Sequence, residues 1–274
     1  MLFSLTVFNG LSLVSALIYL LGAILAAINI TNDKQLHNLR QLVLSSAFAA
    51  LFIHILLVMH SYNVNHIISN DFFSMLSLIF LVISLLFFVS AFTQPIESLA
   101  IIVFPFSALA VLLNFGNVLP VSIPVQMDGA LQLHIILSVL SYSLLTVAAF
   151  QAVFLSIQEK QLHNQQSSRF IQRLPPLQLM ETLLFRVISL GVFLLTFALV
   201  TGFVFLEDIF AQHIAHKTIL SIFAWVVFAT LLCGRHFMGW RGQQAVKWTY
   251  GGYAALMLAY FGSKFVLQLI LEQS

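Results

Sequence analysis

The feature that most constrains the fold is a series of long apolar runs separated by short polar breaks. A helix that crosses the hydrocarbon core of a bilayer needs about 20 apolar residues, because each residue adds about 1.5 Å. Scanning with that length predicts about eight transmembrane helices. They are expected at residues 3–29, 40–61, 73–93, 97–115, 131–157, 184–206, 216–236 and 248–271.

Charged residues are too few to coat a water-soluble protein of this length. Only 7% of the 274 residues are charged, whereas soluble domains carry about 25%. Lipid must therefore solvate most of the surface, and because lipid cannot satisfy bare backbone amides, the spans must be helical. We expect an all-α, polytopic membrane helix bundle, one integral membrane domain over residues 1–274 with the lipid bilayer as its main partner. The net charge of +2 argues against nucleic acid as a partner.

The basic residues indicate how the spans are oriented. Nine of the eleven lie in or beside alternate breaks: Lys34, Arg40, Lys160, Arg169, Arg173, Arg186, Arg235, Arg241 and Lys247. Breaks rich in lysine and arginine face the cytoplasm. We therefore expect a multi-pass protein of the bacterial inner membrane with both termini on the outer side.

Nine histidines are many for a chain with so few polar residues, and six fall near the predicted outer surface. His54 lies within the second span, His134 opens the fifth, and His216 directly precedes the seventh. An imidazole inside a membrane bundle is costly to bury and usually has a function or a partner. Imidazole is also an axial ligand of haem iron. For each histidine, the competing interpretation is a hydrogen-bonded structural role.

These positions suggest a haem site close to the outer face. His54 and His134 are expected to approach each other across the bundle and to ligate the haem iron. Lys217 and Lys264 are the cations of the outward half and would meet the two propionates. Cys233 is the single cysteine, which excludes a CxxCH site for covalent haem and a CxxC pair.

Motifs for other chemistry are missing from the sequence. It contains no P-loop, dinucleotide-binding glycine fingerprint, HExxH motif or nucleophile elbow. No acidic residues are paired for general acid–base catalysis, so no catalytic residue is predicted. A small-molecule transporter is a third possibility, but the helices offer mainly Ser, Thr, Gln151 and Asn114 for a polar cavity.

Several stretches resemble a known family. Residues 133–142 form the start of a helix that opens with an external histidine and carries Ser141-Tyr142, which resembles CcsA/CcmC-type cytochrome c assembly proteins. The run 221–228 and the later Gly239-Trp240-Arg241-Gly242 look like the helix that follows the haem-binding loop there. Pro175-Pro176-Leu177, the eight-helix layout and residues 260–263 are similar to the smaller HemX/YpjD branch. The resemblance covers about residues 130–270.

The resemblance implies haem handling at the outer face during cytochrome c maturation, with His134 as the first external haem ligand. It also implies other cytochrome c assembly proteins or an apocytochrome as partners. With no cysteine pair of its own, the chain is expected to be an accessory factor rather than a complete haem lyase. The family's tryptophan-rich loop is reduced here to residues 207–217, which contain no tryptophan. The ligands to test are therefore His54, His134 and His216, and the alternative is a cofactor-free membrane adaptor.

Overall fold

The computed structural model describes residues 4–31, 37–65, 71–115, 129–164, 174–205 and 212–262. Within these ranges the regular structure is helical throughout, with eight α-helices and no strand. The prediction of an all-α, polytopic membrane bundle is confirmed.

Six of the helices are long and apolar enough to cross a membrane. They are α1 (Leu5–Thr31), α2 (His37–Asn65), α3 (Phe72–Ala91), α5 (Gly129–His163), α7 (Leu177–Phe205) and α8 (Gln212–Met238). Two are shorter: α4 (Ala100–Leu113), which follows the 3₁₀ turn η1 (Glu97–Leu99), and α9 (Gln243–Met257), which continues into the π-helical turn η2 (Leu258–Gly262).

Two helices, α7 and α9, begin several residues before the predicted spans. The helix α7 begins at Leu177, seven residues before residue 184, where the apolar span was expected to begin. Proline suits a helix start, because it has no N–H to leave unpaired there, and Pro175-Pro176 directly precede Leu177. Likewise α9 begins at Gln243 rather than 248. Hydropathy finds the part of a helix that lies in lipid and misses the turns that extend beyond it.

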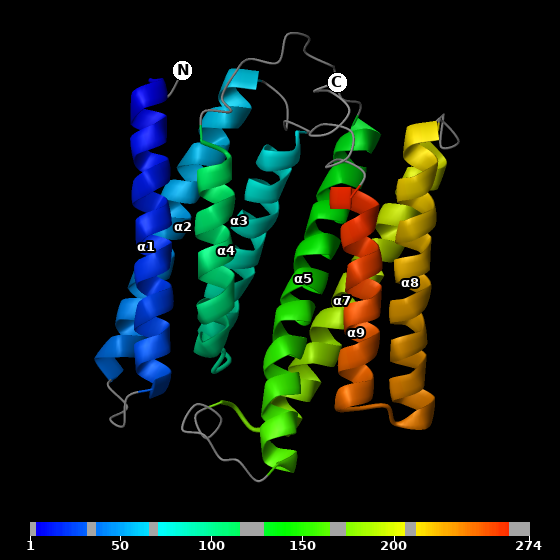
Figure 1. Ribbon diagram of the computed structural model, residues 1–274. Helices are drawn as coiled ribbons and strands as arrows, with labels where there is room; N and C mark the ends of the chain where they lie inside the picture. Colours follow the sequence, from blue (N-terminus) through cyan, green and yellow to red (C-terminus); the bar gives the residue numbers. More distant parts are fainter. Residues whose placement is uncertain are drawn as a thin grey trace. The chain divides into compact units, whose positions relative to one another are not determined.

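The chain divides into two compact units. Unit 1 comprises Met1–Gln126 with Ser167–Pro175, and unit 2 comprises Met127–Gln166 with Pro176–Ser274. In each unit four α-helices run alternately in opposite directions (Figure 1). In unit 1, α1 packs on α2 and α4, while α3 packs on α4 and α2. The prediction of one membrane domain concerns how the units are joined, and it stays a prediction.

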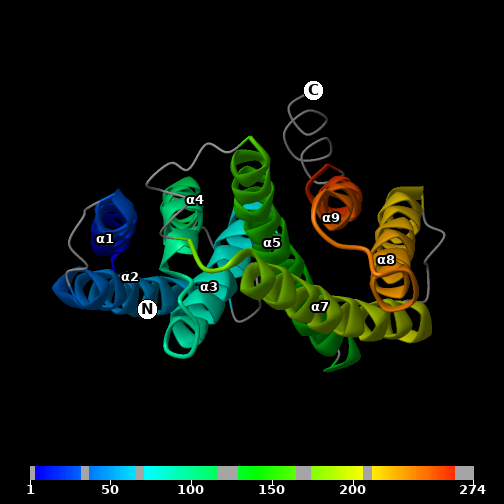
Figure 2. The same ribbon diagram turned by 90° about the horizontal axis from the view of Figure 1, so that it is seen from below.

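Unit 2 is a closed set of four helices. The pairs α5–α7 and α8–α9 are joined by packing between α5 and α9 and between α7 and α8, as the view along the helices shows (Figure 2). Small residues allow the close approach: a Cβ added at Gly191 of α7 would lie 2.8 Å from Leu145 Cδ2 of α5. This packing places the outer ends of α5, α7 and α8 together.

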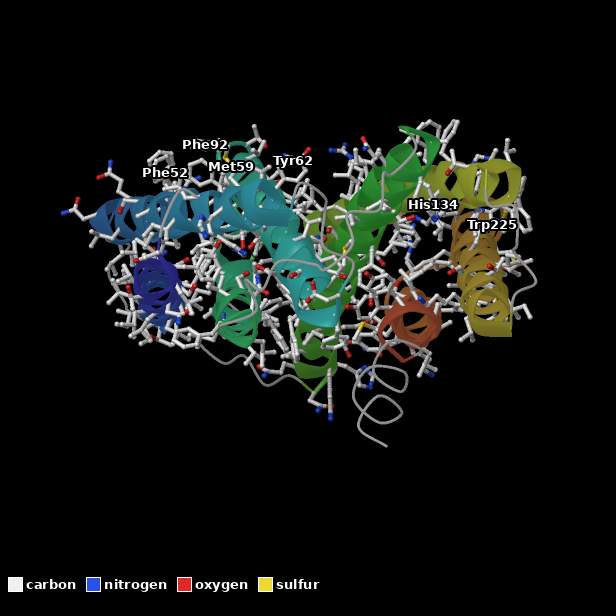
Figure 3. The ribbon with its side chains drawn as sticks, turned by 90° about the horizontal axis from the view of Figure 1, so that it is seen from above. Phe52, Met59, Tyr62, Phe92, His134 and Trp225 are labelled. Carbon is white, nitrogen blue, oxygen red and sulfur yellow. The ribbon has the colours of Figure 1, made fainter. Side chains whose placement is uncertain are left out.

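The surface of the helices is apolar, as expected for contact with lipid. Figure 3 shows Phe52 and Met59 on α2 and Phe92 at the end of α3 pointing away from the helices of unit 1. More than half of each of these side chains is exposed. Aromatic and aliphatic groups can be exposed in this way only where acyl chains replace water.

Candidate functional site

His134 lies near the outer end of α5 and is held against α7 (Figure 3). Its Nδ1 lies 2.9 Å from the carbonyl oxygen of Ala198 and 3.2 Å from Thr201 Oγ1. A carbonyl oxygen can only accept, so Nδ1 carries the proton and donates it. The neutral ring then has its lone pair on Nε2, and in the described part of the chain no group hydrogen-bonds to that atom.

This arrangement is typical of a histidine that ligates a metal. A ligating imidazole usually donates its second ring N–H to a carbonyl or carboxylate, which fixes the tautomer and the orientation of the ring. The Ala198 carbonyl provides that acceptor for His134. The side chain is also only half-buried, so Nε2 can be reached without unfolding the helix pair.

His54 has a different environment. The residue lies on α2 in unit 1 and is 0% exposed. Its Nδ1 lies 3.3 Å from the hydroxyl of Tyr19, and its Nε2 lies 2.9 Å from Ser77 Oγ. Both ring nitrogens therefore take part in hydrogen bonds inside the unit.

The predicted site residues are distributed over both units. His54 belongs to unit 1 and His134 to unit 2, so their predicted approach stays a prediction. Lys217 is half-buried at the start of the membrane-spanning part of α8. His216 precedes it in α8, but its side chain lies outside the described residues, as does all of Lys264. Among the described residues no three His, Cys, Asp or Glu side chains form a metal-binding cluster.

Aromatic residues surround the interior of unit 2. The Trp225 indole Nε1 donates to Thr196 Oγ1 at 2.9 Å and so links α8 to α7 (Figure 3). The same helix, α7, accepts the hydrogen bond from His134 of α5. Deeper in the unit, the Tyr142 hydroxyl donates to Met257 Sδ at 2.6 Å, and its ring lies 6.2 Å from that of Tyr253. In the sequence analysis, Tyr142 and Trp225 belong to the stretches that resemble the family, whereas Thr196, Tyr253 and Met257 were not singled out. Their meeting depends on α5 packing against α9, which no local pattern predicts.

A second polar cluster lies at the opposite, predicted cytoplasmic end of unit 2. Glu181 of α7 is 6% exposed, and its Oε1 accepts the backbone N–H of Gly242 at 2.5 Å. Its Oε2 lies 3.9 Å from Arg235 Nη1, and the Arg235 guanidinium stacks over the Phe185 ring at 4.7 Å. A carboxylate is favourable at the N-terminus of α9 because unpaired amides carry partial positive charge there. The cluster fastens the α8–α9 turn to α7.

Gly239 and Gly242 explain the sequence of that turn. Their φ values of 66° and 58° lie in the left-handed region, which favours glycine. Gly239 ends α8, and the N–H of Trp240 then donates back to the carbonyl of Gly234 at 3.1 Å. The two glycines therefore allow the tight turn between α8 and α9.

Comparisons with known proteins agree with this architecture. The family model described as cytochrome C assembly protein matches residues 65–271. The inner membrane protein YpjD of Escherichia coli K12 is 42% identical over 137 residues, 50% of this chain and 52% of the relative. A 28.8 kDa protein of Azospirillum brasilense is 33% identical over 154 residues, 54% of this chain and 57% of that relative. No solved structure matches.

The matched region thus spans about half the length of these curated relatives. The family model, in contrast, covers α3 to η2 and therefore every described helix of unit 2, including His134. Together with the six long apolar helices, the relative's inner-membrane location supports a multi-pass protein of the bacterial inner membrane. The chain belongs to the cytochrome c assembly protein family.

Proposed function

We propose that this protein binds haem at the outer end of unit 2, with His134 Nε2 as an axial ligand, and so assists cytochrome c assembly. The observation that carries the proposal is the hydrogen bond from His134 Nδ1 to the Ala198 carbonyl. It leaves Nε2 as the basic nitrogen of a neutral, oriented imidazole, the form that binds iron.

The described surroundings suit haem. The ring of haem is flat and apolar, and Trp225, which is hydrogen-bonded to Thr196 of α7, supplies a surface of that kind. Lys217 is a half-buried cation at the outer end of α8, where it would form an ion pair with a haem propionate. We propose His216 as the second ligand to test and Lys264 as the second cation. When bound, haem would supply an iron for axial ligation and vinyl groups for attachment to a cytochrome.

His54 has a weaker claim to the iron. It would have to lose its hydrogen bond with Tyr19 or with Ser77 before either nitrogen could ligate. Breaking such a bond inside a dry bundle leaves an unpaired hydroxyl, which costs about 1–3 kcal/mol. His134 needs no comparable change.

In this function the chain holds and orients haem and leaves bond formation to other proteins. The family is associated with haem, but thioether formation needs a pair of apocytochrome cysteines, and Cys233 is the only cysteine of this chain. We therefore propose an accessory role beside an apocytochrome or other assembly proteins.

The test is an absorption spectrum of the detergent-purified protein, oxidised and then reduced with dithionite, before and after haem is added. We expect a Soret band with sharpened reduced bands, which His134→Ala removes or shifts. His236→Ala is the matched control, because that exposed imidazole lies at the opposite end of unit 2. A flat spectrum after haem addition would reject haem binding and favour the cofactor-free adaptor. An unchanged spectrum in His134→Ala would reject this ligand.

A further inference from the structure

A row of side-chain contacts crosses the predicted cytoplasmic end of unit 2, where the chain turns from α8 into α9 (Figure 1). The Arg235 guanidinium stacks over the Phe185 ring at 4.7 Å, and its Nη1 donates to the Trp240 carbonyl at 3.2 Å. The Trp240 ring packs on the Trp248 ring, with the two centroids 5.1 Å apart. We call these four residues the inner row. It joins α7, α8, the turn and α9.

Each aromatic residue of the inner row has a basic residue next to it in the sequence. These neighbours are Arg186 on α7, Arg241 in the turn and Lys247 on α9, and all three side chains are exposed. We call them the three inner cations. Because the contacts of the inner row hold their neighbours together, cations from three separate segments lie around one part of the surface.

The acidic residues at this end of unit 2 are turned inward. Glu181 is 6% exposed and is held by Arg235 and by the N–H of Gly242. The Glu159 carboxylate lies against Gly242, and its Oε2 is buried. No other Asp or Glu belongs to the described residues of unit 2. The charge that this end presents to its surroundings is therefore mainly positive.

Apolar surface adjoins this positive charge. Phe237 and Met238 are the last residues of α8, and their side chains are 79% and 73% exposed. The indole rings of Trp240 and Trp248 are half-buried. Tryptophan favours the level of the lipid headgroups, because its ring is apolar and carries one polar N–H. A partner that fits this surface has a negative group beside an apolar one.

We propose that the inner row and the three inner cations bind an anionic phospholipid of the inner leaflet. The lipid phosphate pairs with the cations, and a guanidinium can do so through two parallel N–H bonds. The glycerol lies beside the two indole rings, and the acyl chains extend along Phe237 and Met238. An acidic soluble protein would match the cations but would leave the apolar side chains uncovered.

The bound lipid joins segments that the protein already connects from inside. Glu181 fastens the turn to α7 on the buried side, and the phosphate joins the same segments on the exposed side. This binding differs from the general excess of cations in cytoplasmic loops, which orients helices during insertion and selects no lipid. The proposal is independent of haem binding, which we place at the opposite end of unit 2.

The test measures which lipid lies beside Trp240 and Trp248. The chain has three tryptophans, so Trp225→Phe leaves these two as the source of tryptophan fluorescence. The purified protein is reconstituted in phosphatidylcholine vesicles that contain either brominated phosphatidylglycerol or brominated phosphatidylcholine with the same acyl chains. Bromine quenches nearby tryptophans, and the two degrees of quenching give the binding constant of the anionic lipid relative to the zwitterionic one.

Two triple variants separate the effect of charge from that of folding. Arg186→Gln, Arg241→Gln and Lys247→Gln together remove the positive charge from exposed positions, where a substitution seldom affects folding. Arg186→Lys, Arg241→Lys and Lys247→Arg together keep the charge and are the matched control. Circular dichroism checks that each variant is as helical as the starting protein.

We expect phosphatidylglycerol to bind at least about threefold more strongly than phosphatidylcholine, because each basic residue near the surface attracts an anionic lipid. The glutamine variant should bring this ratio to within about 1.5-fold of unity, and the charge-keeping variant should stay within about twofold of the starting protein. Equal binding of the two lipids by the starting protein would overturn the proposal and favour an acidic protein segment as the partner. An undiminished preference in the folded glutamine variant would also overturn it.

Discussion

The two units each contain a histidine in the outward half of a membrane helix, but the two imidazoles have different neighbours. In unit 1, His54 has both nitrogens hydrogen-bonded to side chains and is closed off from the surface. In unit 2, His134 has one nitrogen bonded to a backbone carbonyl and the other uncommitted. The first arrangement stabilises the core of unit 1. The second arrangement orients the His134 ring and leaves Nε2 available to bind a metal.

The difference teaches that depth in the membrane does not decide what a buried histidine does. Each imidazole lies within hydrogen-bond distance of a group on a neighbouring helix, Ser77 of α3 for His54 and Ala198 of α7 for His134. His54 faces hydroxyl groups, which donate and accept, so a chain can continue through them. His134 faces a carbonyl, which only accepts, so the proton is fixed on Nδ1.

The largest effect on stability should come from removing the His54 imidazole. His54→Leu leaves the Tyr19 and Ser77 hydroxyls without a partner in an apolar core, and we expect it to cost about 3 kcal/mol of unfolding free energy. His134→Leu should cost less than about 1 kcal/mol, because its ring is partly exposed. Thermal unfolding in detergent measures both. Equal losses would mean that the two histidines have equivalent structural roles.

A substitution at the close contact between helices in unit 1 should lower the free energy of unfolding nearly as much. A Cβ at Gly22 of α1 would lie 2.6 Å from Ser46 Oγ and 2.9 Å from the Phe104 ring, which is fully buried and cannot move away. Gly22→Ala should therefore lower the unfolding free energy by about 1–3 kcal/mol. Gly10→Ala on the same helix meets nothing within 4 Å and should stay within about 0.5 kcal/mol of wild type. A neutral Gly22→Ala would show that α1 and α2 are less closely packed.

In unit 2, removal of the Glu181 carboxylate should have a moderate effect on stability. Glu181→Ala removes the acceptor for the Gly242 N–H and the partner of Arg235. We expect a loss of about 1–2 kcal/mol in unfolding free energy. Glu181→Gln keeps an acceptor oxygen and should recover part of that loss. If the two variants were equally destabilised, the negative charge rather than the hydrogen bond would fasten the turn.

The smallest effect should come from Thr201, the weaker partner of His134. Thr201→Val removes the contact at 3.2 Å but leaves the Ala198 carbonyl, which fixes the same tautomer. Haem titration should therefore give an affinity within about threefold of wild type. A loss of about tenfold or more would show that the hydroxyl, rather than the carbonyl, orients the ring.

Much of the fold follows from sequence because lipid enforces simple rules. The length of apolar runs predicted the helices, whereas α7 begins directly after Pro175-Pro176, seven residues before the predicted span. The starts of α7 and α9 lie before the predicted spans, because Glu181 and Lys247 interrupt the apolar runs near the beginning of these helices. The division into two units could not be predicted, because it depends on which apolar faces meet.

For the site, the sequence identified the histidines but not their partners. His134 was selected by its place at the start of a span and by family resemblance, and its Ala198 acceptor lies on another helix. The prediction that His54 ligates iron treated a membrane histidine as unpaired. Tyr19 and Ser77 have ordinary positions in apolar runs, so only tertiary packing could reveal their hydrogen bonds to His54.

The most direct test of the central claim is a haem titration of wild type, His134→Gly and His54→Leu, each with and without added imidazole. We predict that His134→Gly loses the Soret band and regains it when free imidazole occupies the space of the missing side chain. His54→Leu should bind haem as wild type does, although it is less stable. Normal binding by His134→Gly together with loss of binding in folded His54→Leu would contradict the account.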